Sequence, residues 1–198
     1  MTLAASTKGD RTRNSLIAAG VVRFAREGYR GTSVAHVCRD AGLSTTASYP
    51  YFANKEALFV AAVDEDVAQL IDQAVSMVLI GTEPEHWGRV MMRGLLERME
   101  DHPLARRIVS GLEPDFTMRL LDIPALAELR KAVTELIRAE QASGEVRRDI
   151  EAEQTANGMV VIVISLLMAS IQTGSAGFEL VADDVESVLN AATRPPTG

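Results

Sequence analysis

Glycine and proline residues divide this chain into segments of helical length, and no segment sustains the alternation of apolar and polar residues that is typical of a strand. Within the segments, apolar residues recur every three or four positions. We therefore predict an all-α protein of about nine helices. The expected helices cover residues 11–27, 33–40, 44–49, 54–79, 85–101, 103–112, 124–143, 151–173 and 182–193.

The stretch STTASYPYFANKEALF, residues 44–59, contains the sharpest of these breaks. Pro50 would be the sixth residue of a helix capped by Ser44, where a proline removes a backbone hydrogen bond and biases Tyr49 away from helical geometry. Asn54 can cap the long helix that follows. The third helix is therefore short, and a long helix begins almost at once.

Two short helices joined by a tight Ala-Gly-Leu turn at Gly42 have the shape of a helix-turn-helix, whose second helix enters the major groove of DNA. The second helix presents hydroxyl groups, which can meet base edges or phosphates. It carries no Arg, Asn or Gln, so DNA shape should contribute to specificity. The candidate DNA-contacting residues on it are Ser44, Thr45, Thr46, Ser48 and Tyr49.

Lys55 lies in the first turn of the fourth helix, where a cation opposes the helix dipole by roughly 0.3–1 kcal/mol. A DNA phosphate bound at that helix start would account for the lysine. The alternative is a solvated surface lysine. Tyr51 and Phe52 are expected in the core rather than against bases.

Charge is unevenly distributed. Residues 1–55 carry eight Lys or Arg and three acidic residues, a net charge of +5, so the rest of the chain carries −12 of the total of −7. A basic N-terminal quarter can approach a polyanion while the acidic remainder opposes indiscriminate adhesion. Chance surface charge is the alternative interpretation.

Other classes of protein find little support in the sequence. His36, His86 and His102 lack metal-ligand spacing, Cys38 is expected in the core, and no catalytic motif is present, so we predict no metal, no cofactor and no enzyme activity. The longest apolar run, residues 159–171, is too short for a bilayer, which needs about 20 residues. Without a leader segment, the chain is expected in the cytoplasm and not at a membrane.

Residues 16–58 resemble the DNA-binding domain of TetR-family transcriptional regulators. The resemblance rests on AAGVVRFAREGY, then GTSV, then AGLS, then YPYFANKEAL, all at the family's spacing. It implies a dimeric, all-helical repressor with three DNA-binding helices and a variable ligand-binding bundle. By position, Thr32 or Ser33 would contact a phosphate, as would Lys55, while Thr45, Thr46, Ser48 and Tyr49 would face the DNA. Family members often carry Lys-Gly or Arg-Gly in place of Thr45-Thr46. The DNA contacts that the resemblance implies most directly are therefore those of Tyr49 and Lys55.

The expected domain organisation follows from the motif. Residues 1–10 would form a flexible arm, 11–55 the DNA-binding domain, 56–194 the ligand-binding and dimerisation domain, and 195–198 a frayed tail. Because the helix near 151–173 is apolar nearly all round, one face needs a cover besides its own bundle. The resemblance implies a homodimer through this helix and the one near 182–193; central burial within one subunit is the alternative.

Methionines are frequent beyond residue 76, and methionine lines adaptable pockets as well as filling cores. The candidate ligand-binding residues are Trp87, Met92, Leu95, Met99, Phe116, Met118 and Met159. We expect a repressor that a small hydrophobic ligand releases from a palindromic double-stranded DNA operator. The alternatives are a DNA-binding regulator without a small-molecule inducer and an all-helical enzyme.

Overall fold

The computed structural model describes residues 8–78, 86–174 and 176–195, and these ranges contain helices and no strand, which confirms the predicted all-α class. The helices are α1 (Lys8–Gly31), α2 (Val34–Asp40), η1 (Thr45–Ser48), α3 (Lys55–Val78), α4 (Trp87–Arg98), η3 (Met99–Asp101), α5 (Pro103–Val109), α6 (Pro114–Thr117), η4 (Met118–Asp122), α7 (Pro124–Ser143), α8 (Ala152–Thr173) and α9 (Ala176–Thr193).

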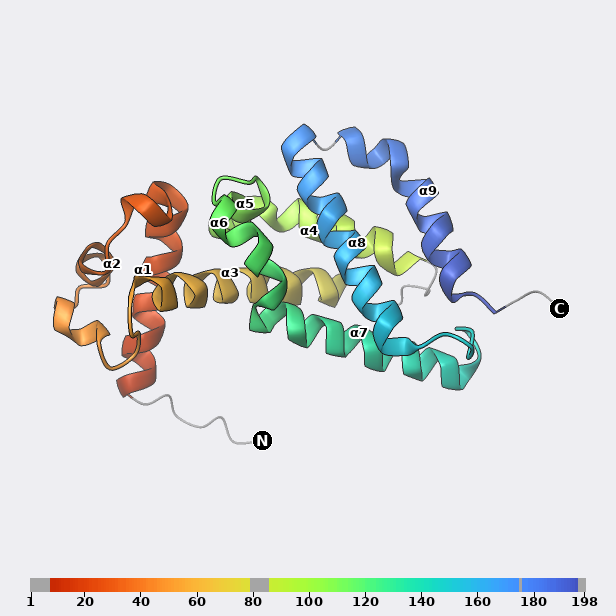
Figure 1. Cartoon of the computed structure of the whole chain (residues 1–198), viewed down its shortest axis with the longest axis horizontal. Helices are drawn as coiled ribbons and strands as arrows, with labels where there is room; N and C mark the ends of the chain where they lie inside the picture. The colour runs from red at the N-terminus through yellow and green to blue at the C-terminus, as the bar shows by residue number, and fades with distance from the viewer. Residues whose placement is uncertain (1–7, 79–85, 175, 196–198) are drawn as a thin grey trace.

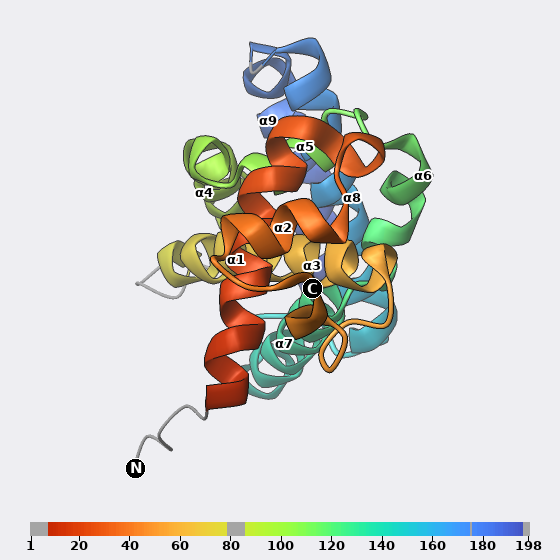
Figure 2. The same cartoon turned by 90° about the vertical axis from the view of Figure 1, so that its left-hand side faces the viewer.

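The molecule is elongated. Figure 1 shows α1, α2 and η1 gathered at one end, where they form what we call the head, while α4 to α9 form the body. Helix α3 runs lengthwise from the head into the body and packs against α1, α4, α5 and α7. In the view of Figure 2, α1 and α2 stand in front of the body.

The head has its own share of the core. Leu16, Ile17 and Phe24 of α1 are buried against α3, as their helical spacing predicts. Gly28 interrupts α1 with a φ of 74°, which a residue with a side chain rarely adopts, and the chain resumes one more helical turn to Gly31. The predicted break in this helix is therefore at the right residue.

An aromatic cluster lies where head and body meet. Tyr29 from α1, Phe59 from α3 and Phe116 from α6 are mutual neighbours, with ring centroids 4.4–5.1 Å apart. Such pairs are worth about 0.5–1.5 kcal/mol beyond the area they bury. The end of α1 is thus packed against the body as well as against α3.

Several helix boundaries follow local chemistry. Asn54 caps α3 by accepting a hydrogen bond from the Ala57 amide at 2.8 Å, and Gly144 ends α7 in the left-handed region. Pro103 and Pro124 begin α5 and α7 at positions where a missing N–H is harmless. Residues 114–122, which lie outside all of the predicted helices, form two short helices.

Helix α8 has 22 residues and extends beyond the apolar run of residues 159–171, so by length and composition alone, and unlike that run, it could cross a membrane. One of its faces is buried in the body through Ala156, Val160 and Leu167. Val161 and Ile162, on the opposite face, are 43% and 37% exposed. The predicted helix that is apolar nearly all round is therefore covered on one side only within the single chain.

Candidate nucleic-acid interface and body cavity

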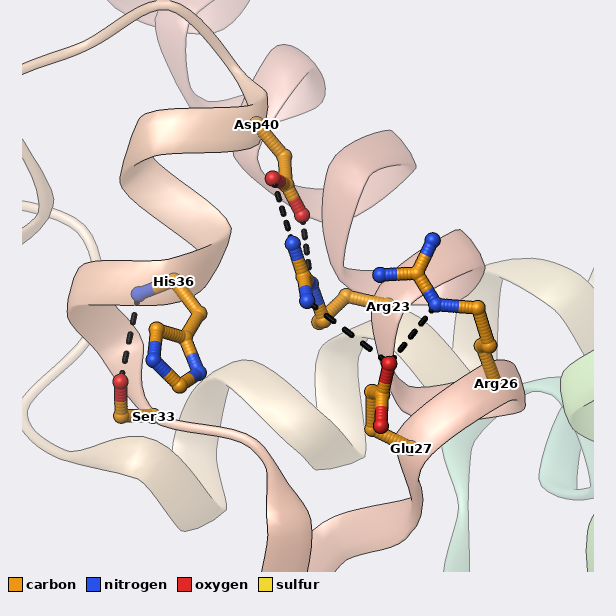
Figure 3. A network of polar contacts seen from close by, with 6 residues as sticks. All are labelled: Arg23, Arg26, Glu27, Ser33, His36 and Asp40. Carbon is orange, nitrogen blue, oxygen red and sulfur yellow. Dashed lines mark hydrogen bonds and ion pairs between the residues drawn. The ribbon is translucent and has the colours of Figure 1, made fainter.

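A bidentate ion pair fixes α2 against α1. The Arg23 Nε and Nη2 atoms donate to the two carboxylate oxygens of Asp40, at 2.6 and 2.7 Å (Figure 3). These hydrogen bonds hold the pKa of the Asp40 carboxyl below its usual value. Asp40 is the last residue of α2, so the pair orients the turn that follows.

The start of α2 is fixed by a cap. The Ser33 hydroxyl accepts a hydrogen bond from the His36 amide at 3.2 Å, which Figure 3 also shows. This bond satisfies one of the free amides at the helix start. The N-cap of α2 is therefore Ser33.

The turn after α2 depends on Gly42, which has a φ of 68°. The Leu43 amide donates back to the Cys38 carbonyl at 2.8 Å and closes the turn. This geometry resembles a helix C-cap in which glycine supplies the left-handed residue. Cys38 is buried, as expected.

The third helix is shorter than predicted. Residues 45–48 form one 3₁₀ turn, and the Tyr51 and Phe52 amides both donate to the Ser48 carbonyl. Pro50 has no amide to extend an α-helical ladder, so the chain closes with these bonds instead. Phe52 is 5% exposed and belongs to the core, while Tyr51 is half-buried.

Some of the predicted DNA-contacting residues are exposed and others are buried. Ser44, Thr45 and Thr46 are exposed on the short turn, and the Ser44 and Thr46 hydroxyl oxygens lie 3.0 Å apart. Tyr49 is 69% exposed. All four side chains are therefore exposed in the segment that follows the Gly42 turn.

Two predicted contacts are buried instead. Ser48 is 1% exposed, and its hydroxyl donates to the Thr45 carbonyl at 2.9 Å. Thr32 is 3% exposed. The expectation that Ser48 faces a groove does not fit this structure, because the tight 3₁₀ turn directs its side chain inward.

Lys55 is held by the end of α1. Its ammonium group donates to the carbonyls of Tyr29 and Thr32, at 2.9 and 3.1 Å, and lies 4.2 Å from the centre of the Tyr29 ring. These contacts stabilise a cation at a helix start where the dipole alone opposes it. Two of the three N–H groups are used internally, which leaves one directed away from these carbonyls.

Two further cations of the head were not predicted as DNA contacts. Arg39 is exposed on the last turn of α2, one turn before Gly42. The Arg13 guanidinium lies 5.7 Å from the centre of the Phe52 ring, on the side of the head that carries the short turn. The excess of basic residues in the first 55 positions was the signal that could have identified them.

The body contains an apolar cavity of about 150 Å³. Helices α3, α4, α5, α7, α8 and α9 all contribute to its walls. Of the predicted ligand-binding residues, Trp87, Met92, Leu95 and Met159 line it. Other wall residues were not predicted, because an apolar residue of a bundle helix carries no mark that separates cavity wall from core; they include Val67, Leu70, Leu129, Val163 and Leu189. The polar Asn190 also lines the cavity and was not predicted.

The remaining predicted ligand residues lie elsewhere. Met99 is 1% exposed and belongs to the core rather than to this cavity. Phe116 packs on Tyr29 and Phe59 and lines a second space, of about 160 Å³, between α3, α5 and η4. The Met118 side chain is outside the described part of the structure.

Charged groups on the cavity wall are paired with one another. Arg89 of α4 donates to Glu186 of α9 at 2.8 Å and also contacts Asp183, and His86 donates to Glu186 at 2.7 Å. Hydrogen bonds, first from His86 and then from Arg89, keep the pKa of Glu186 below its usual value. The pairing ties α9 to α4 and leaves the cavity apolar. Among the described residues no group of His, Cys, Asp and Glu could hold a metal ion.

Comparison with known proteins places this geometry in context. Residues 16–62 match the family described as "Bacterial regulatory proteins, tetR family". The chain is 29% identical over 178 residues to the "HTH-type transcriptional repressor AcnR" of Corynebacterium jeikeium (strain K411), covering 85% of this chain and 86% of that protein. It is 26% identical over 151 residues to the "HTH-type transcriptional repressor NicS" of Pseudomonas putida, covering 72% and 69%.

Solved structures share the fold. A TetR-family regulator from Pectobacterium atrosepticum has a TM-score of 0.72 at 20% identity, covering 96% of this chain and 98% of that one. One from Cytophaga hutchinsonii has a TM-score of 0.70 at 20% identity and covers both chains fully, at 100%. The fatty acid degradation regulator FadR from Bacillus halodurans has a TM-score of 0.66 at 19% identity, covering 96% of each chain.

Proposed function

Since this chain belongs to the TetR family of bacterial transcriptional regulators, we propose that it is a homodimeric repressor that an uncharged hydrophobic effector releases from a palindromic DNA operator. The observation that carries the proposal is the run of exposed side chains beyond the Gly42 turn, namely Ser44, Thr45, Thr46 and Tyr49. Residues 11–55 serve DNA binding and residues 56–194 serve effector binding and dimerisation. The protein acts in the cytoplasm, where its operator is.

DNA recognition combines weak direct readout with phosphate contacts. Hydroxyl groups of Thr45 and Thr46 meet base edges, the Thr methyl groups can touch a thymine methyl, and Tyr49 reaches the backbone. The free N–H of Lys55 takes a phosphate, together with the amides at the start of α3. Without a bidentate base reader on the turn, part of the specificity comes from DNA shape.

The dimer forms through α8 and α9. One stripe along α8 consists of exposed residues at helical spacing, namely Gly158, the adjacent pair Val161 and Ile162, Ser165 and Ala169. Val188 of α9 is 65% exposed. A stripe of apolar and small residues lets two helices approach closely. In a two-fold symmetric dimer, the stripe of each subunit would cover the stripe of the other.

The effector occupies the body cavity. The walls are almost wholly apolar, and the charged pair Arg89–Glu186 is satisfied internally, so a charged ligand would leave its charge unpaired. Asn190 and Thr193 are the neutral polar side chains on the wall. We therefore assign the effector to the uncharged, hydrophobic compounds that carry one hydrogen-bonding group, which Asn190 can meet.

The experiment that tests this function is selection of binding sites from random duplex DNA by the purified protein at near-physiological salt. Enrichment of a palindrome with half-sites about one helical turn apart, or two overlapping copies of it, is expected. A parallel selection with Tyr49→Ala controls for retention by charge alone. Enrichment of no motif by the unaltered protein would exclude sequence-specific regulation.

A further inference from the structure

The ion pair Arg107–Glu113, whose carboxylate is buried and whose guanidinium is half-buried, lies where body and head meet. Glu113 is 7% exposed, and its Oε1 atom accepts hydrogen bonds from the Arg107 guanidinium at 2.7 Å and from the Tyr29 amide at 3.0 Å. The same guanidinium donates to the Ala25 carbonyl at 3.4 Å. Two charged groups of the body thus bind the backbone of α1 on both sides of its break.

The break in α1 is shaped to receive this pair. A Cβ atom at Gly28 would lie 2.5 Å from Arg107 Nη2 and 2.7 Å from Glu113 Oε1, closer than such atoms approach in proteins. With its φ of 74°, Gly28 also turns the Tyr29 amide out of the helical ladder and toward Glu113. The position of the pair and the conformation of the helix end therefore depend on each other.

The end of α1 in turn sets the position of Lys55. The ammonium group binds the Tyr29 carbonyl and lies over the Tyr29 ring, so a movement of Tyr29 moves the lysine. Glu113 holds the amide of that same residue. One residue, Tyr29, separates the buried carboxylate of the body from the phosphate-binding lysine of the head.

Helix α5 connects this pair to the cavity. Ala105 and Val109, four positions apart on one face of α5, line the cavity, whereas Arg107, between them in sequence, points from the other face to α1. Asp66 of α3 accepts from the Leu104 and Ala105 amides at the start of α5, at 2.9 and 2.8 Å. Because these hydrogen bonds hold the start of α5, a cavity occupant that displaces one face of this short helix displaces the whole helix.

We propose that Arg107 and Glu113 are positioning residues that couple the α5 wall of the cavity to the end of α1 and thereby to Lys55. The inference rests on the proposed function, because it names how occupation of the cavity changes DNA binding. An occupant that displaces Ala105 and Val109 moves Arg107, which loosens the hydrogen bond from the Tyr29 amide to Glu113 and withdraws the lysine from its phosphate.

A double-mutant cycle tests the coupling without a known effector. Ala105→Leu adds side-chain volume to the cavity from α5, and Glu113→Ala removes the carboxylate. Amide hydrogen exchange at Tyr29 is measured by NMR in the four proteins, together with their affinity for the selected operator. Val109→Ile, which adds one methylene to the same wall, replaces Ala105→Leu if that variant does not fold.

Two further variants serve as matched controls. Asp115→Ala removes a carboxylate that also joins the body to α1, through Arg30 at 3.2 Å, but both side chains are mostly exposed, at 69% and 87%. The Tyr29 amide exchange rate and the operator affinity of Asp115→Ala should match those of the unaltered protein. Glu113→Gln keeps an oxygen that can accept from the Tyr29 amide and should preserve its protection.

Coupling predicts that Ala105→Leu in the otherwise unaltered protein speeds exchange of the Tyr29 amide about tenfold and weakens operator binding about fivefold. In the Glu113→Ala background, Ala105→Leu should change neither the exchange rate nor the affinity. Equal effects of Ala105→Leu with and without Glu113, or no effect on Tyr29 exchange, would overturn the proposal. Because the exchange measurement needs no DNA, it judges the coupling even if the protein selects no operator, which would be a failure of the proposed function.

Discussion

The ammonium nitrogen of Lys55 lies 2.9 Å from the Tyr29 carbonyl oxygen and 4.2 Å from the centre of the Tyr29 ring. A lysine at the start of α3 thus completes the end of α1, 26 residues earlier in the chain. The same side chain is the candidate phosphate contact. Lys55 is therefore expected to contribute both to the stability of the head and to the affinity for DNA.

Replacing Lys55 should affect both properties. Lys55→Met removes two hydrogen bonds from a charged donor, and because the lysine is half-buried we expect a loss of about 1–2 kcal/mol of unfolding free energy. Binding to all DNA sequences should weaken, and the slope of log affinity against log salt should fall by about one phosphate contact. Denaturant unfolding and fluorescence anisotropy titrations measure the two effects.

Arg39→Met is the matched control, since it removes the same charge from an exposed position of the head. It should lower DNA affinity through charge alone and leave the unfolding free energy unchanged within about 0.5 kcal/mol. If both variants unfold like the unaltered protein, the internal hydrogen bonds of Lys55 contribute nothing measurable.

The short turn offers a second contrast. Thr46→Ala alters an exposed side chain, so it should change the preferred base at one position of each half-site and leave stability within about 0.5 kcal/mol. Ser48→Ala removes a buried hydroxyl that bonds to the Thr45 carbonyl and should cost about 1 kcal/mol with the base preference unchanged. Site selection with each variant, beside thermal unfolding, distinguishes the two; the reverse pattern would show that Ser48, not Thr46, faces the groove.

The Arg23–Asp40 pair predicts a dependence of stability on pH. Hydrogen bonds from Arg23 favour the ionised carboxylate and lower the pKa of Asp40, so the stabilisation is complete at neutral pH and is lost as pH falls through that lowered pKa. The difference in melting temperature between the unaltered protein and Asp40→Asn should be constant from pH 7 to about 5 and shrink below about pH 4. A difference that is the same at pH 3 and pH 7 would argue against the ion pair as its source.

The outer face of α8 predicts the oligomeric state. Ile162→Glu places a charge on the exposed apolar stripe, and it should convert the dimer into a monomer in sedimentation velocity at micromolar concentration. Val22→Glu is the control, because Val22 is 61% exposed and belongs to α1 in the head, whereas α8 belongs to the body (Figure 1). A monomer in the unaltered protein, or a dimer in both variants, would remove α8 as the interface.

Much of the fold was predictable because local chemistry dictates it. Pro124 and Gly144 bound α7, so the predicted range of 124–143 is the observed one. The break at Gly28 and the cap at Asn54 were also identified from the residue types alone. Residues 79–85, which include part of the predicted helix near 85–101, are outside the described part of the structure.

The candidate site was less predictable where orientation depends on tertiary packing. Ser48 has the same spacing and chemistry as its exposed neighbours, and only the 3₁₀ geometry of the turn directs it inward. Met92 and Met99 both belong to the predicted helix 85–101, yet Met92 lines the cavity and Met99 does not. The Glu113–Tyr29 contact joins residues 84 positions apart, and no local sequence pattern predicts such a contact.

The central claim, that the head reads DNA sequence, is tested most directly by one ratio. The dissociation constant of the unaltered protein for its selected palindrome is compared with that for a duplex of the same composition in scrambled order, at one near-physiological salt concentration. We predict that the palindrome binds at least about 10³-fold more tightly, with two chains bound per duplex. A ratio near one would mean that the protein binds phosphates alone, and would contradict the account.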